Sequence, residues 1–209
     1  MKYMRISQPF ILALALNDYD PFFGAKSIEN SRDLDERVYF QVLDYMKTTR
    51  ARSVLVLVGG EPFLDPRFEE ILTIANDYGW STSVDTWVGF GTKANSLKQI
   101  HQMRLRLLSL DPKKHDELLS KTGNHRRALV FGKRLELDFP GEKILVFPIC
   151  RENRDEMANI LEWCRMHNFH PNMFIVPRQH EKALNRNEYP KVIQEMCTLP
   201  LQDIIIDTP

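Results

Sequence analysis

The residues best suited to chemistry form the segment Gly59-Gly60-Glu61-Pro62. Two adjacent glycines permit positive φ and close backbone approach, and Pro62 bars helical geometry at Glu61. Free backbone groups beside a carboxylate suit a ligand with an ammonium group, because the carboxylate pairs with the cation and carbonyls accept its protons. The segment therefore predicts a site for an amino acid or a related amine. An ordinary turn is the alternative, since glycine and proline punctuate turns routinely.

The elements around this segment would place it at the edge of a sheet. Residues 53–58 carry no charge and are dominated by β-branched and aliphatic side chains, which is typical of a strand buried on both faces of a parallel sheet. Asp65 and Pro66 then resemble the N-cap and first residue of a helix over 66–78, and a second strand is predicted at 80–86. We therefore predict a βαβ unit whose glycine turn follows the carboxyl end of its first strand.

The rest of the chain repeats this alternation of strands and helices. Further strands are predicted at 10–16, 104–110, 143–150 and 172–176, and further helices from about Leu34, at 94–102, at 124–137, from Asp155 and at 191–196. Such alternation implies an α/β fold with parallel strands and right-handed crossovers. The pattern fits either an open barrel or a flat, doubly wound sheet.

Composition narrows the class of protein. The chain has 209 residues, of which 43% are hydrophobic, and its 28 basic and 28 acidic residues give a formal net charge of zero. This balance argues against general nucleic-acid binding or an anionic membrane surface. No apolar run approaches the ~20 residues of a membrane span. Three widely spaced cysteines do not form a disulfide framework, so we expect a reducing, cytoplasmic location.

Several segments resemble the radical S-adenosylmethionine (SAM) enzymes. Gly59-Gly60-Glu61-Pro62, followed by Leu64-Asp65-Pro66, is similar to the second signature of that family. Three further segments resemble the family's fourth strand and the loop after it: Leu108-Ser109-Leu110-Asp111, His115-Asp116 and Thr122-Gly123-Asn124. Residues 147–153 and 155–163 resemble the family's fifth strand and the helix that follows it. The resemblance covers residues from about 8 to 180. It implies a partial (β/α)6 TIM-like barrel in residues 1–176, with a C-terminal extension, 177–209, that holds a helix and an apolar tail.

The resemblance also implies that the glycine loop and Glu61 hold the amino group of SAM. Ligands of parallel α/β sheets bind beyond the carboxyl ends of the strands. The residues predicted there to bind SAM or another ligand are Gly59, Gly60, Glu61, Pro62, Asp85, Thr86, Ser109, Asp111, Arg151 and Asn153. Among them, Arg151 could bind a carboxylate with two parallel hydrogen bonds, although a surface ion pair is an equal alternative.

One part of the chain departs from the family pattern. Relatives carry three cysteines with C-x3-C-x2-C spacing after the first strand, and these ligate a 4Fe–4S cluster. The corresponding loop holds no sulfur, and we assign its former cluster positions to Asn17, Asp18, Asp20, Pro21 and Gly24. The three cysteines of the chain, Cys150, Cys164 and Cys197, lie elsewhere. Because cluster ligation needs thiolates, the cluster is predicted to be absent.

No metal site is predicted in its place. Asp18, Asp20 and Glu61 could supply oxygen ligands to a hard cation, but nothing in the sequence completes the coordination. Cys164, His167 and His170 have zinc-like spacing, yet they lie on diverging parts of a helix and its following turn and lack a fourth ligand. Catalytic residues remain unassigned.

These observations favour a cluster-less radical-SAM-like protein, a pseudoenzyme. It would bind SAM, a small substrate, a peptide or a partner radical SAM enzyme without radical chemistry. One alternative is a non-radical SAM- or metal-dependent enzyme that uses Asp85, Asp111 or Glu61 as an acid or base. Another is a radical SAM enzyme whose cluster is ligated unconventionally, through Cys150 or by a partner subunit.

Overall fold

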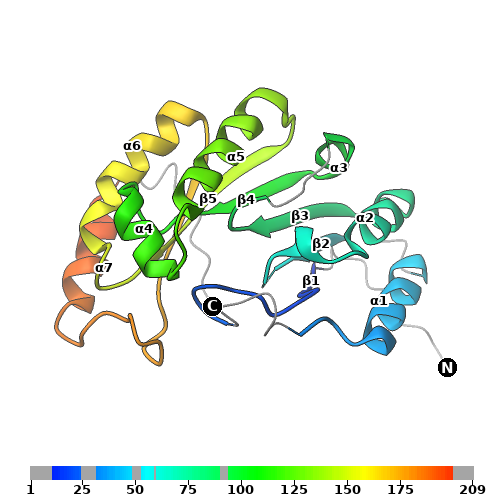
Figure 1. Ribbon diagram of the computed structural model, residues 1–209, viewed down its shortest axis with the longest axis horizontal. Helices are drawn as coiled ribbons and strands as arrows, with labels where there is room; N and C mark the ends of the chain where they lie inside the picture. The colour runs from blue at the N-terminus through cyan, green and yellow to red at the C-terminus, as the bar shows by residue number, and fades with distance from the viewer. Residues whose placement is uncertain (1–10, 25–31, 49–52, 59, 90–93, 200–209) are drawn as a thin grey trace. The chain divides into compact units, whose positions relative to one another are not determined.

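The computed structural model describes residues 11–24, 32–48, 53–58, 60–89 and 94–199. They belong to two compact units: residues up to Met103 with Asp138–Gly141, and Arg104–Leu137 with the residues from Glu142 onward. Six parallel strands alternate with helices, and their order in the sheet follows the sequence from β1 to β6 (Figure 1). The predicted α/β fold, an open (β/α)6 arrangement, is confirmed.

The first unit holds the glycine turn. Its elements are β1 (Ile11–Leu14), α1 (Glu36–Thr48), β2 (Val54–Leu57), the 3-10 helix η2 (Pro62–Leu64), α2 (Phe68–Asp77), β3 (Ser81–Thr86) and α3 (Ala94–Gln99), and β4 (Gln102–Arg106) begins in this unit and ends in the second. In the parallel register, Val54 lies opposite both Ile11 and Ser81. Leu55 and Leu57, on one face of β2, are fully buried, whereas Val54 and Val56 on the other face are half-buried. The prediction of a strand buried on both faces is therefore correct for one face only.

The second unit contains the remaining strands and helices. They are α4 (Pro112–Leu119), α5 (Asn124–Asp138, whose last residue belongs to the first unit), β5 (Glu142–Ile149), the 3-10 helix η3 (Arg154–Glu156), α6 (Met157–His167), β6 (His170–Ile175) and α7 (Tyr189–Thr198). Strands β5 and β6 pair in parallel, with Ile144 opposite His170. The inward face predicted for α6, made of Met157, Ile160, Leu161 and Cys164, is confirmed.

The start of α2 differs from the prediction. The helix begins at Phe68 rather than Pro66, and η2 precedes it. The carboxylate of Asp65 accepts hydrogen bonds from the backbone N–H of Arg67 at 2.8 Å and from its guanidinium at 2.7 and 2.9 Å. Asp65 therefore holds the Arg67 side chain and does not cap a helix that starts at Pro66. The predicted apolar face of α2 is nevertheless buried.

The region after β4 was predicted incompletely. The strand ends at Arg106 rather than Leu110, because the N–H groups of Leu108 and Leu110 donate to the side chains of His115 and Glu156 and not to a neighbouring strand. Helix α4 was missed, although Asp111 caps it by accepting the Lys114 N–H at 2.9 Å and a proline follows Asp111.

The apolar face predicted for α1 from the sequence, made of Val38, Val42, Leu43 and Met46, is buried only in part. Val38 was expected to point inward but is 42% exposed. The buried residues are Tyr39, Leu43 and Met46, and the Tyr39 hydroxyl donates to Glu70 Oε2 at 2.8 Å. Leu43 and Met46 therefore face inward as predicted, and Tyr39, an aromatic residue with a polar partner, is buried where Val38 was expected.

Some predictions fall where the structure does not test them. Phe10, Gly59 and the apolar tail after residue 199 lie outside the described residues. The domain boundary at residue 176 stays a prediction. Within the described ranges, no helix is both long enough and apolar enough to cross a membrane.

Candidate functional site

The glycine turn after β2 requires glycine at position 60. Its φ is +71°, a left-handed conformation that other residues adopt only with strain. A Cβ atom at this position would lie 2.3 Å from both the backbone O and the side-chain Oδ1 of Asn17. Gly60 therefore gives the turn its shape and leaves room for the Asn17 side chain.

Asn17 joins the former cluster loop to the glycine turn. Its Nδ2 donates to the Glu61 carbonyl at 3.0 Å, and the Glu61 N–H donates to Asn17 Oδ1 at 3.1 Å. The residue is 5% exposed, so both bonds are shielded from water. The Asn17 amide therefore fixes the backbone of Glu61. That Asn17 stands where the family has its first cluster cysteine stays a prediction from the sequence resemblance.

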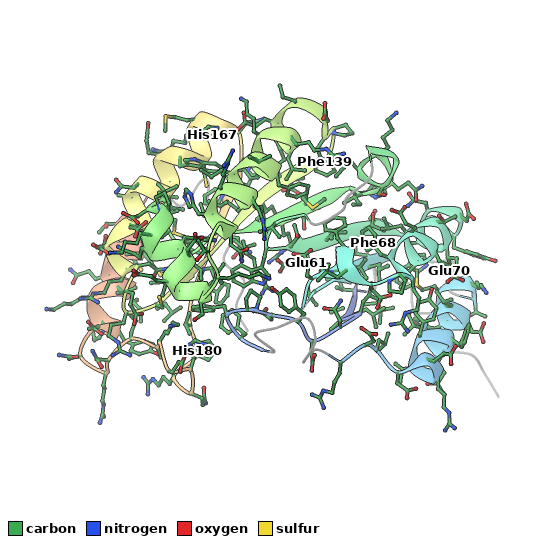
Figure 2. The ribbon with its side chains drawn as sticks, viewed as in Figure 1. Glu61, Phe68, Glu70, Phe139, His167 and His180 are labelled. Atoms are coloured by element: carbon green, nitrogen blue, oxygen red, sulfur yellow. The ribbon has the colours of Figure 1, made fainter. Side chains whose placement is uncertain are left out.

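The Glu61 carboxylate is completely buried on the turn labelled in Figure 2. It accepts hydrogen bonds from Thr86 Oγ1 at 2.7 and 2.9 Å and from the Trp87 N–H at 3.0 Å. Among the described residues, no lysine, arginine or histidine pairs with it. Burial raises the pKa of Glu61 to about 7 despite these hydrogen bonds, and the charge of Asp85 adds to the rise. A buried carboxylate without a counter-ion is suited to a cationic ligand.

The other residues of the former cluster loop have local partners. Asp18 accepts the Arg32 backbone N–H and pairs with the Arg32 guanidinium at 3.0 Å on the surface. The backbone hydrogen bond first, and then the side-chain bond, hold the pKa of Asp18 below its ordinary value. Asp20 Oδ1 accepts the N–H groups of Phe22 and Phe23 at 3.0 and 2.8 Å, and the Asp20 carbonyl accepts the Gly24 N–H at 2.9 Å. Pro21 is buried within the same turn. The loop is therefore closed by its own hydrogen bonds.

The residues present do not fit an iron–sulfur cluster or a metal ion at this loop. Residues 17–24 contain no thiol. Cys150 and Cys164 lie in the second unit, where burial raises their pKa values to about 11 and about 12, and Cys197 is exposed on α7. Within the described ranges, no group of three or more histidine, cysteine, aspartate or glutamate side chains could hold a metal.

In the second unit, Ser109 is engaged by a residue that the sequence did not indicate. Its Oγ donates to the Glu156 carboxylate at 2.9 and 2.8 Å, and the Leu110 N–H donates to the same carboxylate at 2.9 Å. Lys114 Nζ lies 2.6 Å from Glu156 Oε1 and neutralises it, and the hydrogen bond to Glu156 raises the pKa of Lys114. Ser109 is thus part of an internal ion-paired cluster.

The remaining predicted site residues of the second unit also have structural partners. Asn153 is fully buried, and its amide donates to the carbonyls of Leu108 and Pro148 at 2.8 and 2.9 Å, which ties the ends of β4 and β5 together. Asp111 caps α4. Arg151 donates through Nη2 to the Glu181 carbonyl at 2.8 Å, and its N–H donates to the Lys182 carbonyl at 3.0 Å. Their proposed roles in ligand binding stay predictions.

The structure therefore brings together only part of the predicted set within one unit. Gly60, Glu61, Pro62, Asp85 and Thr86 gather around the glycine turn, with Asn17 of the former cluster loop beside them. The sequence did not indicate Trp87 or Glu156. Trp87 acts through a backbone N–H, which has no sequence signature, and Glu156 lies 47 residues from the serine it binds.

Comparison with solved structures identifies the fold. The chain is similar to Streptococcus suis SuiB bound to its precursor peptide SuiA, with a TM-score of 0.73 and 13% identity over 97% of this chain and 49% of SuiB. It is also similar to TYW1 with a lysine-pyruvate adduct, with a TM-score of 0.57 and 14% identity over 88% of this chain and 70% of TYW1. A domain of pyruvate-formate lyase-activating enzyme from Bacteroides vulgatus gives a TM-score of 0.55 and 19% identity over 73% of this chain and 98% of that domain.

Sequence comparison adds no closer assignment. No protein-family model matches the chain, and no curated protein matches it. SuiB has also been solved bound to S-adenosylmethionine, and the chain spans about half of its length. At these identities the likeness establishes architecture, and the chain has the radical-SAM-like fold.

Proposed function

We propose that this chain is a cluster-less radical-SAM-like protein, a pseudoenzyme that binds the ammonium group of SAM at Glu61 without radical chemistry. The observation that carries the proposal is the buried Glu61 carboxylate, which has hydrogen-bond donors but no cation among the described residues. A buried charge is costly unless it is paired. A ligand ammonium would supply the missing charge.

The residues of the turn suit the amino-acid end of such a ligand. Thr86 Oγ1 and the Trp87 N–H orient the carboxylate, and Asn17 fixes the backbone that carries it. When bound, SAM would contribute a primary ammonium group and a sulfonium. The chain's own contribution is to hold the carboxylate ionised opposite that ammonium and to exclude water from the pair.

We infer the absence of radical chemistry from the lack of cysteine ligands for a cluster in this loop. Three thiolates would be needed near the first strand, and Asn17, Pro21 and Gly24 stand at that spacing. The amide of Asn17 is already committed to the Glu61 backbone. All three cysteines are free thiols, two of them buried, which suits a reducing cytoplasm as part of the proposal.

A peptide is the second ligand that the comparisons favour. SuiB was solved with its precursor peptide SuiA, and the chain shares its architecture. We therefore propose a peptide, or a partner radical SAM enzyme acting on one, as the macromolecular partner. The main proposal does not depend on this partner.

Isothermal titration calorimetry with SAM tests the ammonium site. Wild-type protein is expected to bind SAM, and Glu61→Gln should weaken binding by at least about thirtyfold, since removing one partner of a buried charge pair costs about 2 kcal/mol or more. Glu36→Gln, at an exposed position on α1, is the control and should bind as wild type does. Equal affinity in all three proteins would refute the assignment.

Anaerobic reconstitution with iron and sulfide tests the cluster-less part. After desalting, the protein should retain no stoichiometric iron or acid-labile sulfide, and SAM incubated with reductant should be recovered unchanged. Stoichiometric iron and sulfide would favour an unconventionally ligated cluster. Conversion of SAM without iron would favour a non-radical enzyme.

A further inference from the structure

Strand β1 lies at one edge of the sheet, and among the described residues only β2 pairs with it (Figure 1). The Val58 N–H donates to the Leu14 carbonyl at 3.0 Å, so Leu14 directs its backbone groups towards β2. Because neighbouring residues of a strand direct their hydrogen-bonding groups to opposite sides, Ile11 and Ala13 direct theirs away from the sheet. In the described part of the chain, the outer side of β1 therefore presents unpaired backbone donors and acceptors.

This edge lacks the features by which proteins usually protect an edge strand. Residues 11–16 read Ile-Leu-Ala-Leu-Ala-Leu, without a charged residue or a proline. Ile11 is 67% exposed, and Ala13 and Ala15 are also exposed. An unprotected edge with small or apolar side chains can accept an added strand.

The chain pairs a short segment of its own with the backbone that follows this edge. Residues 32–34 make backbone hydrogen bonds of 2.7 and 3.0 Å to residues 16–18, with an antiparallel bridge between Asn17 and Asp33. No described segment continues this pairing along β1. The outer side of the chain is thus accessible to strand pairing next to β1, and its pairing capacity is used only in part.

A pocket of 320 Å³ lies where β1 meets this segment, and it is lined by Ala15, Asn17, Asp18 and residues 32–35. Its lining holds three carboxylates and one guanidinium. Arg32 pairs with Asp18 at 3.0 Å, whereas Asp35 Oδ1 accepts the backbone N–H of Arg37 at 2.8 Å at the start of α1. The pocket is therefore acidic and suits a lysine or arginine side chain. A second copy of this chain, pairing through the same edge, would bring no cation, because residues 11–16 carry none.

We propose that β1 binds an extended peptide as an added strand, and that the acidic pocket receives a basic side chain of this peptide. The inference rests on the peptide partner of the proposed function, and it names where that partner binds and which charge it carries. Main-chain hydrogen bonds to the edge supply affinity, and the pocket supplies selectivity. Asn17 lines the pocket and also holds the Glu61 backbone, so the bound peptide lies next to the proposed ammonium site.

Fluorescence anisotropy with a labelled synthetic peptide tests the added strand. The probe is a short peptide of alternating threonine and valine with one central lysine, and wild-type protein is expected to bind it. Ala13→Pro removes an N–H that points away from β2, so it should weaken binding by about tenfold or more and leave the pairing with β2 intact. Ala13→Val keeps this N–H and should retain binding. The same probe with N-methylated backbone amides should not bind to wild-type protein, a result that does not depend on the folding of any variant.

A second pair of titrations tests the acidic pocket. Norleucine in place of the lysine keeps the apolar stem of the probe and removes the charge, and wild-type protein should prefer the lysine probe about fivefold. In the double variant Asp33→Asn/Asp35→Asn, this preference should fall below about twofold, while an amide oxygen still accepts the Arg37 N–H. Asp44→Asn, at an exposed position of α1, should retain the preference.

The outcomes separate this inference from the proposed function. Wild-type protein that binds SAM but not the probe overturns the added strand and leaves the ammonium site standing, whereas binding of the probe without SAM does the reverse. Binding of the N-methylated probe, or probe binding that survives Ala13→Pro, overturns the added strand. Equal affinity for the lysine and norleucine probes overturns the role of the pocket. Self-association of wild-type protein that Ala13→Pro abolishes would make a second copy the occupant of the edge and overturn the peptide.

Discussion

Two buried glutamates, one in each unit, have nearly the same hydrogen-bond partners. Glu61 accepts from the hydroxyl of Thr86 and from the N–H of the next residue, Trp87, at 2.7 to 3.0 Å. Glu156 accepts from the hydroxyl of Ser109 and from the N–H of the next residue, Leu110, at 2.8 to 2.9 Å. The difference is one cation, since Lys114 lies 2.6 Å from Glu156 and no described basic side chain pairs with Glu61.

This difference shows which of the two buried carboxylates is neutralised by the protein itself. Hydrogen bonds alone do not repay the burial of a carboxylate, whereas an added ammonium group can do so when the geometry is good. Around Glu156, the chain supplies that ammonium from α4, and the cluster joins the segment between β4 and α4 to η3. Around Glu61, no described side chain supplies a cation, and our proposal assigns that position to a ligand. The same arrangement, a carboxylate that accepts from a hydroxyl and from the next backbone N–H, is therefore structural in the second unit. By our proposal it is a binding site in the first.

The glycine turn gives the largest expected effect. Gly60→Ala introduces a Cβ atom 2.3 Å from Asn17 O and Oδ1 at a φ of +71°, so strain and overpacking add. Gly123 in the second unit has a φ of +82°, but a Cβ atom there would meet no atom within 4 Å, so Gly123→Ala introduces strain alone. We expect losses of unfolding free energy of about 3 kcal/mol at Gly60 and about 1 to 2 kcal/mol at Gly123.

Urea unfolding of the two variants measures this difference. The result would show that the Asn17 contact, and not φ alone, demands glycine in the first unit. Equal losses at the two positions would mean that the loop moves away without cost. In that case Asn17 would not be a fixed anchor of Glu61.

The pH dependence of stability gives a second effect of about the same size. Burial raises the pKa of Glu61 from 4.5 to about 7, so the folded protein binds more protons than the unfolded chain between these values. Stability should therefore fall as pH rises through this window and level off above it. The full effect is about 3 kcal/mol.

Glu61→Gln lacks this titration and isolates it. The unfolding free energy of wild-type protein relative to Glu61→Gln should decrease by about 3 kcal/mol between pH 4.5 and pH 7.5, as measured by urea unfolding at several pH values. Parallel pH curves for the two proteins would indicate that an unrecognised cation already compensates Glu61. Saturating SAM should flatten the wild-type curve, because a bound ammonium lowers the pKa of Glu61.

Sequence patterns predicted the strands and helices better than they predicted the side-chain hydrogen bonds between them. The inward face of α6 was predicted correctly because burial on one side of a helix imposes a period on the sequence. The continuous apolar run of β2 predicted the strand, but it did not show that one face is only half-buried. In helix α1, Leu43 and Met46 face inward as predicted, but Tyr39 is buried in place of Val38 because its hydroxyl bonds to Glu70. A single polar contact between distant residues leaves no periodic trace.

The candidate site shows the same limit. The glycine turn and Thr86 were predicted from local chemistry and from strand ends. The bond between Asn17 and Glu61 joins residues 44 positions apart, and the Trp87 contribution comes from backbone. Asp111-Pro112 did contain a recognisable helix start, so α4 could have been found from its cap and proline.

Removing the cation from the second unit would make its cluster resemble that of the first, and this is the smallest effect expected. Lys114→Met leaves Glu156 buried with only its hydrogen bonds. Because the Lys114 side chain is 33% exposed, water partly screens the pair, and we expect a loss of about 1 to 2 kcal/mol. Lys113→Met removes an 85% exposed lysine that lies 3.8 Å from Glu117, and it should change stability by less than about 0.5 kcal/mol.

The decisive measurement is how the Lys114→Met loss varies with pH. The hydrogen bond to Glu156 raises the pKa of Lys114 above its ordinary 10.5, so the advantage of wild type over Lys114→Met should be full below that pH and should shrink as pH rises above it. Lys113→Met should run parallel to wild type throughout, because its partner stays in water. A Lys114→Met loss that is independent of pH would mean that hydrogen bonds alone suffice for a buried glutamate in this fold. The missing cation at Glu61 would then no longer argue for a ligand.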